Sequence, residues 1–259
     1  MRRWHSGYCS RLQMRRHTDS EGRLALTPLF SVGEGKAKPD FSWVRIPVSA
    51  SRRTKFLLRI TSPLRGFGKI RKMKKVYIIH GWGGSSEKDW IPWLETELKK
   101  KRFKVKSFDM PDSENPKIEK WIKHLELKIN PEELDENSYF VGHSVGCQTI
   151  MRYLEKLHKH KKIGGCVFVA PWFNLINLEQ EELEIAHPWT NTKIDFSRIL
   201  DHCNNFLAIF SDNDPFVHSN EIEKFKNNLG AKTIIKKKKG HFTSEDGVKK
   251  IPEILDFLK

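Results

Sequence analysis

The stretch SYFVGHSVGC, residues 138–147, decides the fold of this 259-residue chain. Its first five residues form a short, mostly apolar run that is typical of a buried strand. The residues after Ser144 repeat apolar side chains at helical spacing. Between strand and helix, Gly142-His143-Ser144-Val145-Gly146 matches the pattern Gly-x-Ser-x-Gly, in which the glycines leave space for a serine in a strained turn. This context predicts a nucleophile elbow at Ser144.

Similar patterns lie on both sides of this stretch. Apolar, β-branched or aromatic runs predict six strands, at 76–79, 103–108, 138–142, 165–170, 206–211 and 233–237. Amphipathic segments predict helices near 89–101, 118–129, 145–158, 219–229 and 248–258. Strands that alternate with helices indicate right-handed βαβ units. We therefore expect an α/β fold with a doubly wound, mostly parallel six-stranded sheet.

Charge divides the chain near residue 72. Residues 1–72 hold 12 Arg and 5 Lys against 4 acidic residues, whereas residues 73–259 hold 30 basic and 28 acidic residues. The formal charge of +15 therefore belongs almost entirely to the N-terminal segment. We expect a basic, disordered or mis-annotated extension at 1–72 and one folded domain at 73–259.

Three interpretations of residues 1–72 stay open. In the first, the natural start is Met73, directly before a buried strand, and the upstream residues are a translation of non-coding sequence. In the second, the segment is an organellar transit peptide, because it is rich in Arg and Ser and poor in acidic residues. In the third, it is a basic tail that binds a polyanion. No nucleic-acid partner is expected for the nearly neutral residues 73–259.

Cysteine usage and hydropathy indicate the compartment. Four cysteines without a CxxC pair indicate free thiols of a reducing compartment; they are Cys9, Cys147, Cys166 and Cys203. No apolar run approaches the roughly 18 residues of a membrane helix. The N-terminus lacks the apolar core of a secretory signal. We expect a cytoplasmic monomer or homodimer without membrane association.

A second chemical motif, His80-Gly81-Trp82-Gly83-Gly84, follows the first predicted strand. Its glycines let the backbone turn, so that the Trp82 amide can face the nucleophile. The Val145 amide, at the start of the helix after Ser144, offers a second donor. Two such donors are what the oxyanion of an acyl-transfer intermediate needs. A phosphate-binding GxxxxGK[ST] loop is absent from the sequence.

Two further polar turns follow the fifth and sixth predicted strands. The first holds two candidate acids, Asp214 and, as the alternative, Asp212. The second, Gly240-His241-Phe242, holds a candidate base. Because the carboxyl ends of parallel strands meet at one edge of the sheet, we expect Ser144, Asp214 and His241 to converge there. The chain order Ser, Asp, His is that of α/β-hydrolases.

With these motifs, residues 73–259 resemble the small serine hydrolases grouped with retinoblastoma-binding protein nine and its bacterial relatives. The shared features are HGWGG at 80–84, GHSVG at 142–146, VAP at 169–171, SDNDP at 211–215 and GHF at 240–242. The resemblance implies a compact α/β-hydrolase fold with little or no lid. It implies Ser144, Asp214 and His241 as a catalytic triad and the two amides above as the oxyanion hole. It also implies an esterase or peptidase that acts on small substrates.

These observations predict acyl transfer to water, with a small ester or amide as substrate and no cofactor. Gly81, Trp172, Phe173 and Trp189 are candidates for the substrate pocket, although the aromatic residues could equally be core residues. We expect residues 187–189 to lie in a long irregular stretch that covers the site. No metal is expected, because no third ligand is spaced to join the two motif histidines.

Two alternative functions stay open beside hydrolysis. One is a hydrolase-fold binding module for which turnover does not matter. The other is polyanion binding through residues 1–72.

Overall fold

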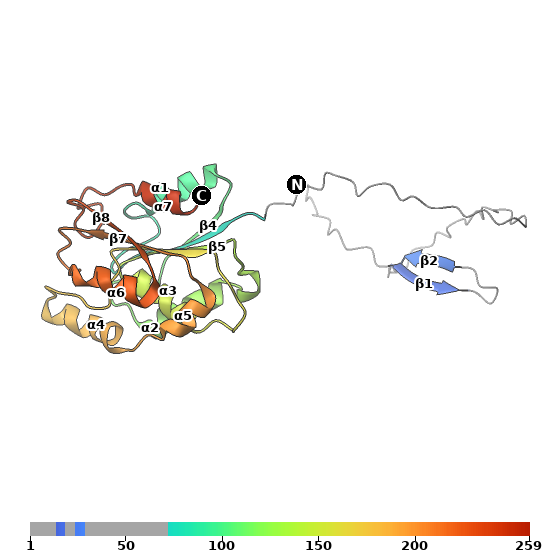
Figure 1. Ribbon diagram of the computed structural model, residues 1–259, viewed down its shortest axis with the longest axis horizontal. Coiled ribbons are helices and arrows are strands. Elements are labelled where there is room, and N and C mark those ends of the chain that lie inside the picture. Colours follow the sequence, from blue (N-terminus) through green and yellow to red (C-terminus); the bar gives the residue numbers. More distant parts are fainter. Residues whose placement is uncertain (1–13, 19–23, 29–71) are drawn as a thin grey trace, which may run out of the picture. The chain divides into compact units, whose positions relative to one another are not determined.

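The structure is a computed structural model that describes residues 14–18, 24–28 and 72–259 (Figure 1). The chain divides into two compact units between Pro63 and Leu64. In the first unit, β1 (Met14–Thr18) pairs antiparallel with β2 (Leu24–Pro28). We predicted no strand here, because MRRHT at 14–18 is mostly polar and LALTP at 24–28 ends in proline, so neither shows a strand pattern. The interpretations of residues 1–72, and Cys9, otherwise fall outside the described residues.

A six-stranded sheet forms the centre of the second unit. Its strands are all parallel and lie in the order β4-β3-β5-β6-β7-β8. Their bounds are β3 (Lys75–Ile79), β4 (Lys104–Phe108), β5 (Ser138–His143), β6 (Gly165–Val169), β7 (Phe206–Ser211) and β8 (Lys232–Lys236). Each lies within one residue of its predicted range, and the predicted α/β fold class is confirmed.

Helices cover both faces of this sheet (Figure 1). One face packs against α1 (Ile91–Lys100) and α7 (Pro252–Phe257). The other packs against α2 (Ile118–Lys128), α3 (Val145–Glu155), α5 (Phe196–His202) and α6 (Asn220–Leu229). The remaining helices are the 3-10 turn η1 (Pro131–Glu133) and α4 (Gln180–Asn191). Within the described ranges, no helix is long and apolar enough to span a membrane.

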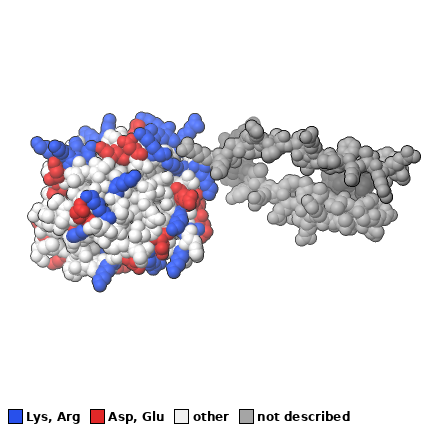
Figure 2. Space-filling view, in the orientation of Figure 1, with Lys and Arg blue, Asp and Glu red and all other residues white. Residues whose placement is uncertain are grey.

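The strand sequences explain this two-layered core. Side chains alternate between the faces of a strand, so Val76 and Ile78 enter the α1 and α7 side while Tyr77 and Ile79 enter the other. All four residues are buried. The edge strands β4 and β8 carry lysines among their residues, and basic and acidic groups are interspersed over the face of the second unit drawn in Figure 2. A strand covered on both faces needs a continuous apolar run, as the sequence shows.

The expectation of an irregular stretch between β6 and β7 was wrong. Residues 187–189 lie inside α4, and α5 follows before β7. A capping box between Glu179 and Glu182 begins α4, and the Asp195 carboxylate caps α5. Pro188 inside α4 obscured the helical pattern in the sequence.

The C-terminal end of α4 is held by Arg152 of α3. This buried guanidinium donates to the carbonyl oxygens of Trp189 at 2.9 Å and Thr192 at 2.8 Å. The last carbonyls of a helix have no partner within the helix, so an external donor stabilises them. Helix α4 is therefore attached to the helix that follows Ser144.

Candidate active site

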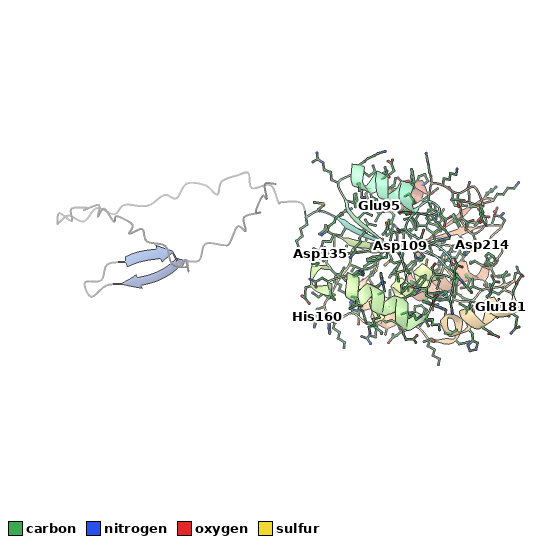
Figure 3. All side chains as sticks on the ribbon, turned by 180° about the vertical axis from the view of Figure 1, so that it is seen from behind. Glu95, Asp109, Asp135, His160, Glu181 and Asp214 are labelled. Atoms are coloured by element: carbon green, nitrogen blue, oxygen red, sulfur yellow. The ribbon has the colours of Figure 1, made fainter. Side chains whose placement is uncertain are left out.

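Three polar side chains meet at the carboxyl edge of the sheet. Ser144 follows β5, Asp214 follows β7 and His241 follows β8. Figure 3 shows Asp214 on the opposite side of the domain from Asp135, which precedes β5 at the amino edge. The parallel arrangement thus brings together residues that are up to 97 positions apart in the sequence.

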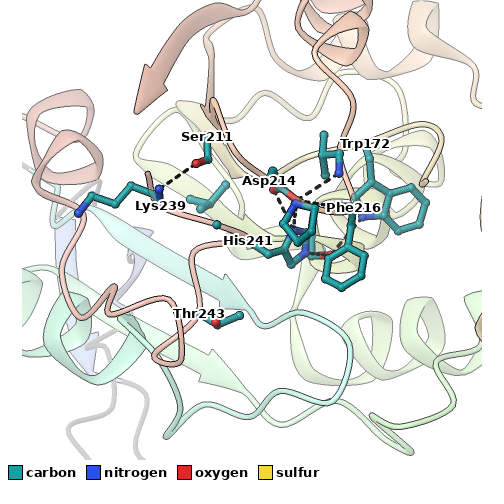
Figure 4. Close-up of polar contacts among 12 residues, drawn as sticks. Trp172, Ser211, Asp214, Phe216, Lys239, His241 and Thr243 are labelled. Atoms are coloured by element: carbon teal, nitrogen blue, oxygen red, sulfur yellow. Dashed lines mark hydrogen bonds and ion pairs between the residues drawn. The ribbon is translucent and has the colours of Figure 1, made fainter. Parts of the chain in front are cut away.

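The contacts among these three residues define a path for a proton (Figure 4). His241 Nε2 lies 2.9 Å from Ser144 Oγ, and His241 Nδ1 lies 3.0 and 2.9 Å from the two carboxylate oxygens of Asp214. A carboxylate only accepts, so the imidazole proton belongs on Nδ1. Nε2 is then free to accept the hydroxyl proton of Ser144.

The two candidate acids differ in what they contact. Asp214 accepts from the amides of Phe216 and Val217 at 2.9 and 3.1 Å, which holds its carboxylate against His241. Asp212 instead accepts from the Lys238 amide at 2.7 Å. The geometry therefore brings Asp214, and not Asp212, to the imidazole.

Ser144 has a strained backbone, with φ 50° and ψ −119°. The two glycines beside it are required for space. A Cβ at Gly142 would lie 2.8 Å from the Cys147 nitrogen, and one at Gly146 would lie 2.5 Å from the Ile79 oxygen. The elbow thus needs glycine on both sides of Ser144 because backbone approaches backbone there.

The loop after β3 is oriented by His80. The Met110 amide donates to His80 Nε2 at 2.9 Å, so His80 carries its proton on Nδ1 and donates it to the Gly81 oxygen at 2.7 Å. Burial lowers the pKa of His80, which keeps the ring neutral. In a trans peptide the carbonyl and the following N–H point in opposite directions. Fixing the Gly81 carbonyl therefore fixes the direction of the Trp82 N–H.

The two predicted oxyanion donors are the amides of Trp82 and Val145. Among the residues that the structure describes, neither amide has a hydrogen-bond partner. The Trp82 indole N–H, by contrast, already has a partner, because it donates to the Glu114 oxygen at 2.9 Å. Both N–H groups are thus available to a bound oxygen.

Two residues outside the predicted site hold the loop of His241. The Asp246 carboxylate accepts from the His241 amide at 2.8 Å and from the amide and hydroxyl of Thr243. Asn213 Oδ1 accepts from the Ser211 hydroxyl and the Gly240 amide, at 2.8 and 2.9 Å. Asn213 lies within a recognised motif, but an acceptor five residues after a loop histidine has no sequence signature.

His143, the residue before Ser144, is also part of this arrangement. Its Nε2 donates to the His241 oxygen at 2.8 Å. Burial, together with the nearby His241, lowers the pKa of His143 to about 4. His143 is therefore neutral at pH 7 and links the elbow to the histidine loop.

The four candidate pocket residues lie at different distances from Ser144. Gly81 is adjacent, since a Cβ there would lie 3.3 Å from Ser144 Cβ, and the Trp172 indole N–H donates to Ser144 Oγ at 3.1 Å. Phe173 stacks on Phe225, with ring centroids 4.3 Å apart. Trp189 is buried and donates to the Pro116 oxygen. Of the four candidates, Trp172 thus contacts Ser144 directly and Gly81 lies next to it.

One further aromatic ring contacts the candidate base. Phe216 packs edge-on against His241, with ring centroids 5.3 Å apart (Figure 4). Nothing in the sequence distinguished Phe216 from other loop aromatics. Its position beside the imidazole makes it part of the wall around Ser144.

Comparison with known proteins places this site in context. A family model described as serine hydrolase matches residues 76–259. The putative hydrolase YdeN of Bacillus subtilis is 30% identical over 185 residues, which cover 71% of this chain and 94% of that protein. The serine hydrolase RBBP9 of Rattus norvegicus is 24% identical over 177 residues, which cover 66% of this chain and 89% of that protein.

The crystal structure of the Bacillus subtilis ydeN product has the same fold. It superposes with a TM-score of 0.65 and 29% identity, covering 72% of this chain and 97% of that chain. The residues matched by the family model include all six parallel strands apart from the first residue of β3. They also include Ser144, Asp214 and His241.

Proposed function

The chain belongs to the serine hydrolase family, and from this premise we propose that Ser144, Asp214 and His241 are its catalytic triad. We propose that the enzyme cleaves small esters or amides by acyl transfer to water. The observation that carries this proposal is the 2.9 Å contact between His241 Nε2 and Ser144 Oγ, with Asp214 on the other ring nitrogen. Residues 73–259 hold all three side chains, so we assign catalysis to that region.

In the acylation step, Ser144 Oγ attacks the substrate carbonyl carbon while its proton passes to His241 Nε2. Asp214 keeps the proton on Nδ1 and stabilises the imidazolium that forms. The carbonyl oxygen becomes an oxyanion, which the Trp82 and Val145 amides stabilise. The carbon–oxygen or carbon–nitrogen bond then breaks, and the leaving group takes the proton from His241.

In the deacylation step, water replaces the leaving group. His241 Nε2 accepts a proton from the water as its oxygen attacks the acyl carbon. The bond to Ser144 Oγ breaks, and His241 returns the proton to Oγ. The products are a carboxylic acid and the free enzyme, with no cofactor consumed.

The surroundings of Ser144 favour small substrates. Ser144 is only 6% exposed, and Trp172 lies against its hydroxyl. Phe216 packs edge-on against His241, the other ring beside Ser144 Oγ. A short acyl group fits such a site better than a long chain.

A fluorophosphonate probe tests the proposal on the full chain. Wild type should be labelled at Ser144, and Ser144→Ala should not be labelled. Asp214→Asn should react about 10⁴-fold more slowly, the usual effect of disturbing the histidine tautomer. Asp212→Asn is the matched control and should react at the wild-type rate, because Asp212 contacts Lys238. A folded wild type that is not labelled would contradict the triad and favour the binding-module alternative.

A further inference from the structure

A second side chain, besides that of His241, hydrogen-bonds the Ser144 hydroxyl and comes from the loop after β6. The indole Nε1–H of Trp172 donates to Ser144 Oγ at 3.1 Å, and His241 Nε2 lies 2.9 Å from the same oxygen. We propose that Trp172 is a further catalytic residue, whose N–H stabilises the negative charge that develops on Oγ. This inference rests on the proposed function.

The donor properties of the two partners fix the serine hydroxyl. An indole N–H can only donate, so Oγ must accept from Trp172. The hydroxyl hydrogen is then left to donate to His241 Nε2, 2.9 Å away. Trp172 thus directs the hydroxyl hydrogen of Ser144 toward His241 Nε2 before any substrate arrives.

Trp172 is held firmly in this position. Its side chain belongs to the core and the residue is 1% exposed. Its carbonyl oxygen accepts from Gln148 Nε2 at 2.8 Å, and Gln148 lies one turn after Ser144 in α3. Helix α3 therefore positions both the indole and the nucleophile, which helps to keep Trp172 Nε1 within hydrogen-bond distance of Ser144 Oγ during the reaction.

The partner of Trp172 distinguishes it from other buried tryptophans. A buried indole N–H usually finds an acceptor, and a main-chain carbonyl would satisfy it. In the described region, the buried Trp121 and Trp189 and the half-buried Trp82 donate to carbonyl oxygens, and the indole of buried Trp90 has no hydrogen-bond partner. The indole of Trp172 instead donates to the hydroxyl that attacks the substrate.

The charge on Oγ changes in both halves of the reaction. In acylation, Oγ gains charge as its proton moves to His241 and before its bond to carbon is complete. In deacylation, Oγ is the leaving group and gains charge as that bond breaks. The Trp172 N–H acts on Oγ in both steps, whereas the Trp82 and Val145 amides act on the substrate oxygen.

The test compares wild type with Trp172→Phe in the full chain, using the fluorophosphonate probe and pre-steady-state hydrolysis of p-nitrophenyl acetate. Acylation and deacylation should both slow about 10- to 100-fold, the range for losing a hydrogen bond to an atom that becomes charged. Trp121→Phe is the matched control, because it removes a buried indole bond to the Pro111 oxygen. Its rates should stay within about threefold of wild type, as expected when no reacting atom is touched.

A second variant replaces Trp172 with 3-benzothienylalanine, which keeps the ring shape and has sulfur in place of the N–H. This variant tests the inference if Trp172→Phe does not fold. The same loss of rate is expected. The inference about Trp172 is overturned if a folded Trp172 variant, with either phenylalanine or the isostere, reacts at the wild-type rate. In that case the triad still stands, provided that wild type is labelled. If wild type itself is not labelled, the proposed function fails first.

Discussion

The Nδ1–H of His80 donates to the carbonyl oxygen of Gly81, its neighbour in the chain, at 2.7 Å. The Gly84 amide donates to the same oxygen at 3.2 Å. Two donors thus hold one peptide plane, and that plane carries the Trp82 N–H. The orientation of a proposed oxyanion donor therefore depends on a histidine that does not touch the reacting atoms.

Replacing His80 should weaken catalysis through this plane. His80→Ala frees the Gly81 carbonyl and the Met110 amide, so the Trp82 N–H loses its fixed direction. We expect kcat/KM to fall about 10- to 100-fold, within the effect of losing one oxyanion donor. Unfolding in urea should show a loss of about 1–3 kcal/mol for the unpaired buried groups. His124→Ala serves as the control, and an unchanged kcat/KM in folded His80→Ala would contradict the assignment.

The pKa of His143 predicts how stability depends on pH. Its pKa is about 4 in the folded protein, below the 6.5 of an unperturbed histidine. Between these values the unfolded chain binds a proton that the folded protein does not, so stability falls as the pH drops from about 6.5 to about 4. The slope from this group approaches about 1.4 kcal/mol per pH unit. In urea unfolding of His143→Gln across this range, the free energy of unfolding should fall less steeply with pH than in wild type. An unchanged slope would show that His143 does not cause this pH dependence.

The space at Gly146 predicts a severe effect of one methyl group. In Gly146→Ala the new Cβ would lie 2.5 Å from the Ile79 oxygen and 2.6 Å from the His80 oxygen. Neither backbone atom can move without displacing β3, so we expect at least about 3 kcal/mol of destabilisation or about a 10²-fold loss of activity. Gly230→Ala, where a Cβ would meet no atom within 4 Å, should cost about 1 kcal/mol through its positive φ alone. Thermal unfolding and esterase assays compare the two variants.

Asp246 should support catalysis by positioning His241, without touching the reacting atoms. Asp246→Ala removes the acceptor that holds the His241 amide, so His241 should lose its alignment with Ser144. We expect about a tenfold fall in kcat, since small displacements of a base are costly. The exposed Asp256→Ala is the matched control. If chemical denaturation shows that Asp246→Ala is folded and its kcat is unchanged, Asp246 does not position His241 for catalysis.

Strand positions could be predicted from the sequence because β3, β5, β6 and β7 are apolar on both faces. Helix α4 could not, because its buried residues are only Ala186 and Trp189 and Pro188 interrupts its pattern. Helix α5 has seven residues, too few for a helical period to stand out.

The site shows the same limit. Sequence motifs identified Ser144 and His241, yet Asp212 and Asp214 differed only in their place within one turn. The path of the chain after β7 decides which carboxylate reaches the imidazole. Trp172 and Trp189 were likewise equivalent candidates in the sequence, and only the structure shows that one contacts Ser144 and the other Pro116.

Hydrogen bonds join the end of β7 and the turn after it to the turn after β8. Asn213 bonds the Gly240 amide, Asp212 the Lys238 amide, and Ser211 the Lys239 amide. Asp214 and His241 are therefore held in register with each other by contacts between their own two turns, and His143 ties the His241 loop to the elbow that carries Ser144. The alignment of the imidazole with the carboxylate thus does not depend on Ser144.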